Sequence, residues 1–161
     1  MKFKKQYILC FILIAIGTLV IANVAFANNS TDLKEYNFDS HFTMKIPQNV
    51  SLEKTEGQKT GDITLSIVYK NDNAKINIIY VESNGTKEKL SKAYEDIGKN
   101  DSTTNVSKIN NTTVVHFSND RAIGEINYHD LAIAGDDEKY VLMQCDNESL
   151  MKSMAESIKF K

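Results

Sequence analysis

Three histidines, two cysteines and a short acidic run are the residues of this chain whose types could support chemistry. His41, His116 and His129 are far apart in sequence, and none belongs to a His-x-x-x-His or Cys-x-x-Cys pair. Such closely spaced ligands are the usual sequence signature of a zinc site. If residues 118–121 ("SNDR") form a tight turn, position 116 faces position 123, and His129 faces position 110, at a distance from His116. We therefore expect no metal site and interpret the histidines as surface or half-buried side chains on strands.

The acidic run Asp136, Asp137 and Glu138 follows Gly135 and raises the question of calcium binding. A calcium loop of the EF-hand type needs ligands that alternate over about twelve residues and end in Glu. That pattern is absent here. We interpret the run as a solvated turn between two strands.

Only one of the two cysteines is expected to remain after removal of the N-terminal 27 residues, which are described below as a signal. Cys10 lies in the apolar N-terminal stretch, and Cys145 follows the apolar run "YVLMQ". With Cys145 alone, an internal disulfide is excluded. A free thiol at Cys145 could form an intermolecular bridge, but its apolar surroundings favour a small buried side chain.

Other catalytic signatures are also missing. The sequence holds neither a Gly-x-Ser-x-Gly elbow nor a glycine-rich phosphate loop, and its seven glycines are scattered. A carboxylate pair brought together in space stays open as an alternative, because the chain has 21 acidic residues. We expect no cofactor, and we expect that the protein is not an enzyme.

Asn-x-Ser/Thr triplets are the one enriched feature. Nine asparagines begin such a triplet without an intervening proline: Asn28, Asn29, Asn49, Asn84, Asn100, Asn105, Asn110, Asn111 and Asn147. In a secreted protein these are acceptors for N-glycosylation, and the candidates are Asn49, Asn84, Asn100 and Asn105. Turn and cap chemistry also brings Asn, Ser and Thr together, so part of the excess has a structural explanation.

The first 27 residues have the layout of a secretory signal. A basic start with Lys2, Lys4 and Lys5 precedes a run of sixteen uncharged residues, 7–22, and Ala25 and Ala27 fit the cleavage rule. Sixteen residues span only about 24 Å as a helix, short of a hydrocarbon core of about 30 Å. We expect cleavage after Ala27, with a membrane anchor formed by residues 7–27 as the alternative.

The mature chain is then a mildly acidic single domain. Removing residues 1–27 takes away three of the 19 basic residues and none of the 21 acidic ones, which leaves a net charge of −5. The only arginine is Arg121. A chain of this balance is a poor candidate for binding a phosphate backbone, so we expect no nucleic-acid partner.

Periodicity predicts strands first and then a helix. We interpret residues 28–35 as a flexible leader, followed by a strand that ends at Pro47 and a polar connection over residues 48–61. Residues 63–67 and 76–81 alternate apolar and polar side chains, which predicts an antiparallel hairpin. Leu90, Ala93, Tyr94 and Ile97 then follow helical spacing, with Thr86 as the expected N-cap and an end near Gly98–Asn100.

Four more strands and a final helix complete the pattern. The strands are expected at residues 106–109, 112–117, 122–134 and 139–145, joined by short turns, including a type I′ turn at Asn110-Asn111. The run "YVLMQC" is apolar at nearly every position, which predicts a central strand covered on both faces. The last helix is expected from Glu148 to Ser157, capped by Asn147. The order βββ-α-ββββ-α predicts an α+β domain over residues 36–161, with a roughly seven-stranded antiparallel sheet flanked by two helices.

This layout resembles a known family. The segments "FTMKIP", "VSKINNTTVVHF", "YVLMQC" and "SMAESIKF" are similar to the frame of PsbP-like domains, over residues 36–161. The resemblance implies an antiparallel sheet flanked by helices, and a non-enzymatic accessory, assembly or binding role.

Taken together, these patterns lead us to expect a secreted or envelope-associated binding or accessory domain that is not an enzyme. Its partner would be an envelope or extracellular component, contacted through loops such as residues 48–61. Membrane contact is expected only if the N-terminal segment is retained. The alternatives are a hydrolase with a dispersed site and a carrier of a lipid or small apolar ligand.

Overall fold

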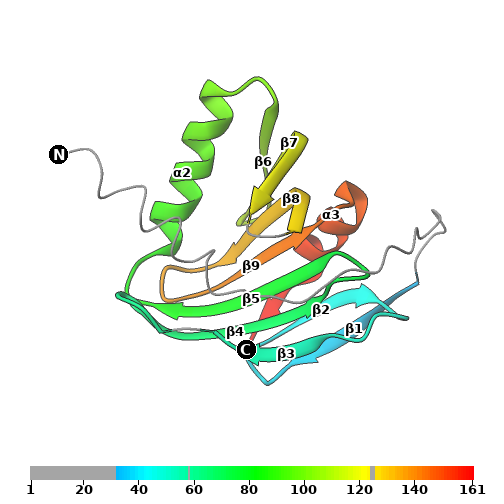
Figure 1. The fold of residues 1–161 in the computed structure, drawn as a ribbon. Helices are drawn as coiled ribbons and strands as arrows, with labels where there is room; N and C mark the ends of the chain where they lie inside the picture. The colour runs from blue at the N-terminus through cyan, green and yellow to red at the C-terminus, as the bar shows by residue number, and fades with distance from the viewer. Residues whose placement is uncertain (1–31, 58, 124–125) are drawn as a thin grey trace.

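The protein is an α+β domain built on one large antiparallel sheet. The computed structural model describes residues 32–57, 59–123 and 126–161 (Figure 1). The large sheet has seven strands in the order β3-β4-β5-β9-β8-β7-β6, and every neighbouring pair is antiparallel. Its strands are β3 (Glu53–Glu56), β4 (Ile63–Asn71), β5 (Ile76–Ser83), β6 (Thr104–Ile109), β7 (Thr112–Ile123), β8 (Ile126–Gly135) and β9 (Lys139–Cys145).

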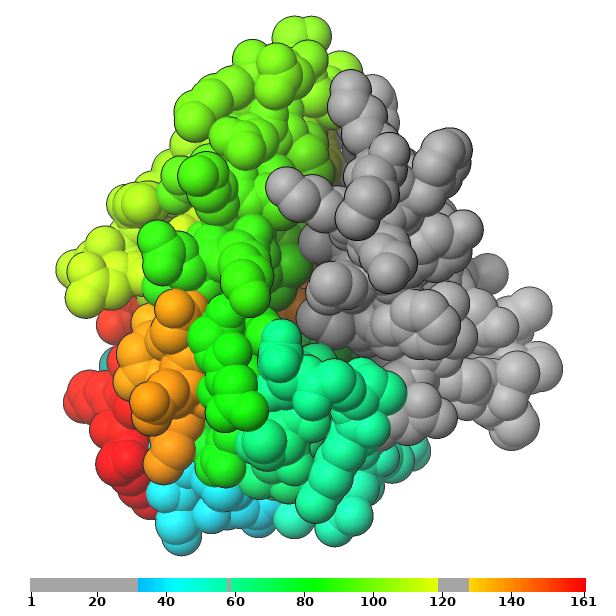
Figure 2. Space-filling model, turned by 90° about the vertical axis from the view of Figure 1, so that its left-hand side faces the viewer, coloured from blue at the N-terminus to red at the C-terminus, as the bar shows by residue number. Residues whose placement is uncertain are grey.

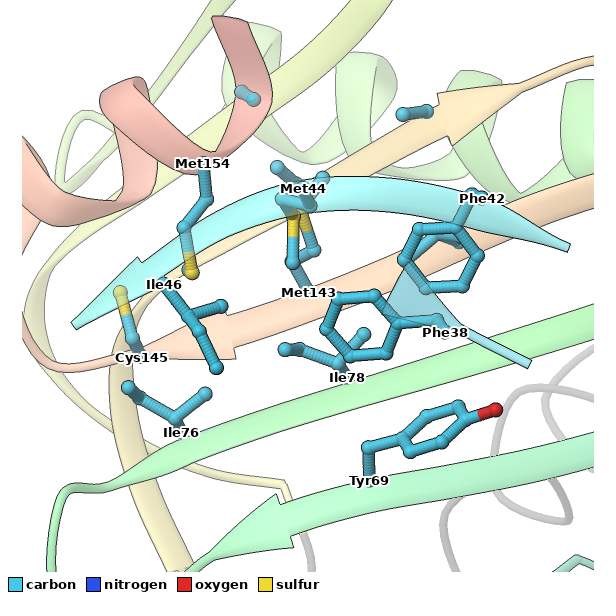
Figure 3. Packing of buried hydrophobic residues seen from close by; sticks show 14 of the residues in the cluster. Phe38, Phe42, Met44, Ile46, Tyr69, Ile76, Ile78, Met143, Cys145 and Met154 are labelled. Carbon is cyan, nitrogen blue, oxygen red and sulfur yellow. The ribbon is translucent and has the colours of Figure 1, made fainter. Parts of the chain in front are cut away.

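One face of the large sheet is covered by a small sheet and by the last helix. The small sheet has the order β1-β2-β10, with β1 at Leu33–Phe38, β2 at Phe42–Pro47 and β10 at Lys159–Phe160. Helix α3 (Glu148–Ser157) lies beside β2. Figure 3 shows the resulting core, where Phe42 and Met44 of β2 and Met154 of α3 lie over side chains of β5 and β9. We call this side of the large sheet the α3 face.

The opposite side of the large sheet, the α2 face, carries helix α2 (Lys87–Asn100). Leu90 and Tyr94 of α2 belong to a second core with apolar side chains of β4, β5, β7, β8 and β9. The helix makes its main contacts with β6, β7 and β8. In Figure 1 it rises beside these strands, away from β4 and β3. Alternating side chains of the central strands β4, β5, β7, β8 and β9 thus enter two separate cores.

The first turn of α2 is capped by a residue far away in sequence. Thr86 occupies the N-cap position, but its side chain makes no capping bond and instead contacts Ser83 Oγ and Tyr140 Oη. The carboxylate of Asp137 accepts the backbone N–H of Glu88 at 2.6 Å. Figure 2 shows this contact region, where the turn between β8 and β9 (orange) lies against the start of α2 (green). A carboxylate here satisfies an otherwise unpaired amide and complements the positive end of the helix dipole.

The N-terminal strands differ from the expectation. The segment predicted as one strand up to Pro47 is broken by a turn at Asp39 and Ser40, both with positive φ, so that β1 and β2 form a hairpin. β1 begins at Leu33, inside the range 28–35 that was expected as a leader. The connection 48–61 contains the strand β3, which pairs with β4. β3 was missed because it is polar at every position and carries no apolar alternation.

Two predicted turns were wrong in detail. Residues 118–121 lie within β7, which continues to Ile123, and the register with β8 shifts between His116 and Arg121. The pairing of β7 with β8 therefore continues through a bulge, although residues 118–121 are of types that favour a turn. In the β6–β7 turn only Asn110 has positive φ, which is the pattern of a type II′ turn and not of type I′.

The remaining elements match the predictions closely. The β4–β5 hairpin, α2, β9 and α3 lie where the sequence places them, and Asn147 Oδ1 accepts the Leu150 amide as the cap of α3. The expected signal, residues 1–27, lies outside the described residues. Within the part of the chain that the structure describes, no helix is long and apolar enough to cross a membrane.

Candidate functional site

Two buried amide side chains stand opposite each other on the α2 face. Asn77 of β5 and Gln144 of β9 are direct cross-strand partners and are only 2% and 1% exposed. Asn77 Nδ2 donates to Gln144 Oε1 at 2.8 Å. The other halves of the two amides, Asn77 Oδ1 and Gln144 Nε2, have no hydrogen-bond partner among the described residues. The pair therefore presents one free acceptor and one free donor side by side.

The surroundings of this pair are apolar. In the strand register, Val68 lies opposite Ile79, Ile79 opposite Leu142, and Gln144 opposite Leu131. All four apolar side chains belong to the α2-side core. We call the surface made by Val68, Asn77, Ile79, Leu131, Leu142 and Gln144 the amide face.

Leaving buried polar atoms unpaired is costly. Each unsatisfied buried donor or acceptor costs roughly 1–3 kcal/mol, so this pair costs about 2–6 kcal/mol relative to a fully bonded arrangement. A third such atom, Ser91 Oγ, lies on α2, the helix of the same face. In native structures such atoms are few and are normally paired with protein or water. Two of these three atoms belong to the cross-strand amide pair.

Helix α2 lies mainly over one half of this face. α2 makes its main contacts with β6, β7 and β8, while α3 lies on the other face. Val68 and Ile79, on β4 and β5, are nevertheless only 6% and 4% exposed. Both belong to the same buried cluster as Leu90 and Tyr94 of α2.

A second polar site lies on the α3 face. His116 of β7 and Asp130 of β8 are cross-strand partners, and His116 Nδ1 lies 2.9 Å from Asp130 Oδ1. The Asp130 side chain is 1% exposed, whereas that of His116 is 35% exposed. Burial raises the pKa of Asp130, although the His116 contact opposes the shift. The buried carboxyl thus orients a partly exposed imidazole.

Charged residues of α3 lie near this histidine. Glu148 forms an i,i+4 ion pair with Lys152 at 2.7 Å, and this pair lowers the pKa of Glu148, with His116 adding to the effect. The pKa of Lys152 is raised, mainly by Glu148, and the charge of Asp130 adds to this shift. Within the described residues, no group of three or more potential metal ligands is found.

A second histidine–aspartate pair lies at the same end of the sheet but on the α2 face. His129 Nδ1 contacts Asp146 Oδ1, and Lys75 Nζ lies 2.5 Å from Asp146 Oδ2. Burial raises the pKa of Asp146, but the hydrogen bonds from Lys75 and His129 outweigh it, and the net shift is downward. Because His129 and Asp130 are consecutive on a strand, the two pairs point to opposite faces. The two histidines therefore do not form one site.

Cys145 is a core residue. It is 1% exposed, and its sulfur lies beside Ile46 and Met154 in Figure 3. The thiol donates to the backbone oxygen of Asn147 at 3.3 Å, and burial raises the pKa of the thiol to about 12. This environment disfavours the thiolate and hence thiol chemistry.

The acidic turn and the candidate glycosylation sites have clear positions. Asp136 accepts hydrogen bonds from the backbone amides of Glu138 and Lys139 and so stabilises the turn. Asp137 caps α2 through the Glu88 amide. Asn49, Asn84, Asn100 and Asn105 are all exposed. Asn100 Nδ2 donates to the backbone oxygen of Asp96, whereas Asn105 lies on the edge strand β6. Asn105 is accessible because it is exposed. In the β6–β7 register it lies opposite His116.

Comparisons with known proteins give no guide to function. No family model, no curated protein and no solved structure matches the chain. Function therefore has to be inferred from the chemistry of the two polar sites.

The amide pair was missed in the sequence. Asn77 sits between Ile76 and Ile78, and such alternation is typical of a solvent-facing polar residue. The signal that could have found it is Gln144. Gln144 is polar in a strand that the sequence predicts to be covered on both faces, and a buried amide there needs partners.

Proposed function

We propose that the mature chain is a secreted or envelope-associated, non-enzymatic domain that binds an apolar ligand or partner through the amide face. The observation that carries the proposal is the free acceptor and donor of Asn77 and Gln144 within an apolar surface. Small-molecule sites commonly combine apolar walls with a few well-placed polar groups. The signal-like N-terminus supports an extracytoplasmic location, and the resemblance to PsbP-like domains agrees with an accessory role.

The charge around the amide face favours a neutral ligand. Lys70, which lies opposite Asn77 in the register, is paired with Asp72 at 3.0 Å. Lys75 is paired with Asp146. Both of these lysines are thus already paired with a carboxylate, which makes them weaker partners for an anionic headgroup.

The test is binding of a neutral apolar dye, N-phenyl-1-naphthylamine, to the protein purified from a secreting host. We expect saturable fluorescence enhancement, weakened by Val68→Thr, which keeps the side-chain shape but adds a hydroxyl to the amide face. The matched control is Thr55→Val, an exposed position on the edge strand β3. Absence of saturable binding, with a folded protein, would contradict the proposal.

A second candidate function, a hydrolase, is favoured by the His116–Asp130 pair. A buried carboxyl that orients a half-exposed imidazole is an arrangement suited to a general base. The test is hydrolysis of p-nitrophenyl acetate by the protein and by His116→Gln. Turnover that His116→Gln abolishes would support this function, and equal rates for the two proteins would exclude it.

A further inference from the structure

We propose that Asn84-Gly85 is a site of spontaneous covalent modification, at which the Asn84 side chain is converted through a cyclic imide to aspartate and isoaspartate. This dipeptide is the only Asn-Gly in the sequence, and it lies in the connection between β5 and α2. The inference is independent of the proposed ligand binding. It depends on the exposure and the backbone conformation of this turn.

The reaction requires only water. The backbone nitrogen of Gly85, after loss of its proton, attacks Cγ of Asn84, so that an N–Cγ bond forms, the Cγ–Nδ2 bond breaks and ammonia leaves. Water then opens the five-membered imide. Attack at Cγ gives aspartate, whereas attack at the former backbone carbonyl gives isoaspartate, in which the main chain runs through the side chain of residue 84. A following glycine favours ring closure, because it has no Cβ to obstruct the nitrogen.

The structure leaves both reacting groups accessible. Asn84 is exposed, and within the described residues neither its side chain nor the Gly85 N–H has a hydrogen-bond partner. Gly85 has φ of +75°, and the atom nearest to a Cβ built on it is Asp137 Oδ2, at 4.0 Å. The turn therefore has room for the imide ring, and no described hydrogen bond has to break before the ring closes.

Other exposed asparagines lack this combination. Asn49 and Asn105 are also exposed, but each is followed by a valine. The branched Cβ of valine crowds the nitrogen that would attack. Asn105 is in addition held in the β6–β7 ladder, which restricts the change of backbone dihedrals that ring closure needs. We therefore expect Asn84 to react before either of them.

The modification changes the entry to α2. The Asn84 N–H donates to the backbone oxygen of Asp62 at 2.9 Å, which fixes the chain just before the reacting side chain. Just after it, the Thr86 hydroxyl donates to Ser83 Oγ at 2.7 Å. Isoaspartate inserts an extra carbon atom into the main chain between these two fixed points, and either product adds a carboxylate near Asp137. We expect the first turn of α2, which Asp137 caps, to be loosened.

The experiment follows the protein secreted by a bacterial host without N-glycosylation, because a glycan on Asn84 would occupy the nitrogen that has to leave. The protein is incubated at pH 6 and at pH 8, and peptide mapping with enzymatic methylation of isoaspartate measures the conversion at each asparagine. We expect Asn84 to convert at least about tenfold faster than Asn105, with isoaspartate among the products. The rate should rise about tenfold for each pH unit, because the deprotonated fraction of the Gly85 amide rises by that factor.

Two variants and a control locate the reaction. Gly85→Ala should slow the conversion of Asn84 by about tenfold or more, because the added Cβ obstructs the nitrogen. Asn84→Gln should remove the isoaspartate signal, whereas the matched control Asn49→Gln, a change at another exposed asparagine, should keep it. If Gly85→Ala does not fold, Asn84→Gln decides. Conversion of Asn84 no faster than that of Asn105, or a product that contains aspartate without isoaspartate, overturns the inference.

Discussion

The cap of α2 by Asp137 gives a prediction that depends on tertiary structure alone. The perturbation is Asp137→Ala, which removes the carboxylate that accepts the Glu88 amide at 2.6 Å. Loss of a helix cap costs about 0.5–2 kcal/mol, and charge-assisted bonds lie at the upper end of that range. We therefore expect the free energy of unfolding to fall by about 1–2 kcal/mol. For a domain of this size the melting temperature should fall by about 2–8 °C.

The assay is urea denaturation followed by circular dichroism, together with hydrogen exchange of the Glu88 amide. Asp137→Asn, which keeps an acceptor but not the charge, should recover part of the loss. Glu138→Ala is the matched control, because Glu138 lies in the same turn and is exposed. The hydrogen-exchange rate of the Glu88 amide should rise in Asp137→Ala and stay unchanged in the control. Equal stability of Asp137→Ala and the native protein, with unchanged exchange at Glu88, would refute the reasoning.

Three further predictions concern the core, the buried carboxyl and one turn. Cys145, with its thiol pKa raised to about 12, should not react with a maleimide at pH 8 in the folded protein and should react within minutes in urea; rapid labelling of the folded protein would show that the thiol is accessible. The pKa of Asp130 is raised by burial, so the folded state disfavours its charged form; Asp130→Asn should gain stability relative to the native protein as pH rises above about 4, measured by denaturation from pH 3 to 8, and a constant difference would contradict the shift. Gly135→Ala should cost about 2–6 kcal/mol, because φ is +115° and a Cβ would lie 2.3 Å from the backbone oxygen of Lys139. Gly61→Ala, with φ of +59° but nothing within 4 Å, should cost only about 1–2 kcal/mol, and equal losses at the two glycines would disprove this account of the turn.

The helices and the central strands were predictable because their signals are local. The apolar face of α2, the Asn147 cap of α3 and the apolar run of β9 all depend on residues close in sequence. Such periodic and capping signals survive in the folded chain because packing reinforces them. The α+β class followed from their order.

The edge strands and the turn between β7 and β8 were not predictable in the same way. β10 has two residues and pairs with β2, more than a hundred positions earlier in the chain. β3 is polar and exposed, and only the β4 ladder defines it. The "SNDR" segment has turn-forming residues, yet it lies within β7 because the β8 ladder continues beyond it. Non-local pairing decides each of these elements.

The polar sites depended on register, which a sequence leaves open. The tight turn expected at residues 118–121 places His116 opposite position 123, whereas the observed register places it opposite Asp130. The histidine–aspartate pair was therefore not predicted, because the expected turn position was wrong. Asn77 and Gln144 likewise meet only because β5 and β9, far apart in the chain, are neighbours in the sheet.

The central claim, that the amide face binds an apolar ligand in the secreted protein, is tested most directly by native mass spectrometry of the full chain expressed in a secreting host. The account predicts a polypeptide that begins at Asn28 and carries a non-covalent neutral adduct, and the adduct should be lost in the variant Asn77→Leu/Gln144→Met. The same spectrum reports glycans at positions such as Asn105. A polypeptide that begins at Met1, with no adduct at any collision energy and no uptake of added N-phenyl-1-naphthylamine, would contradict the account.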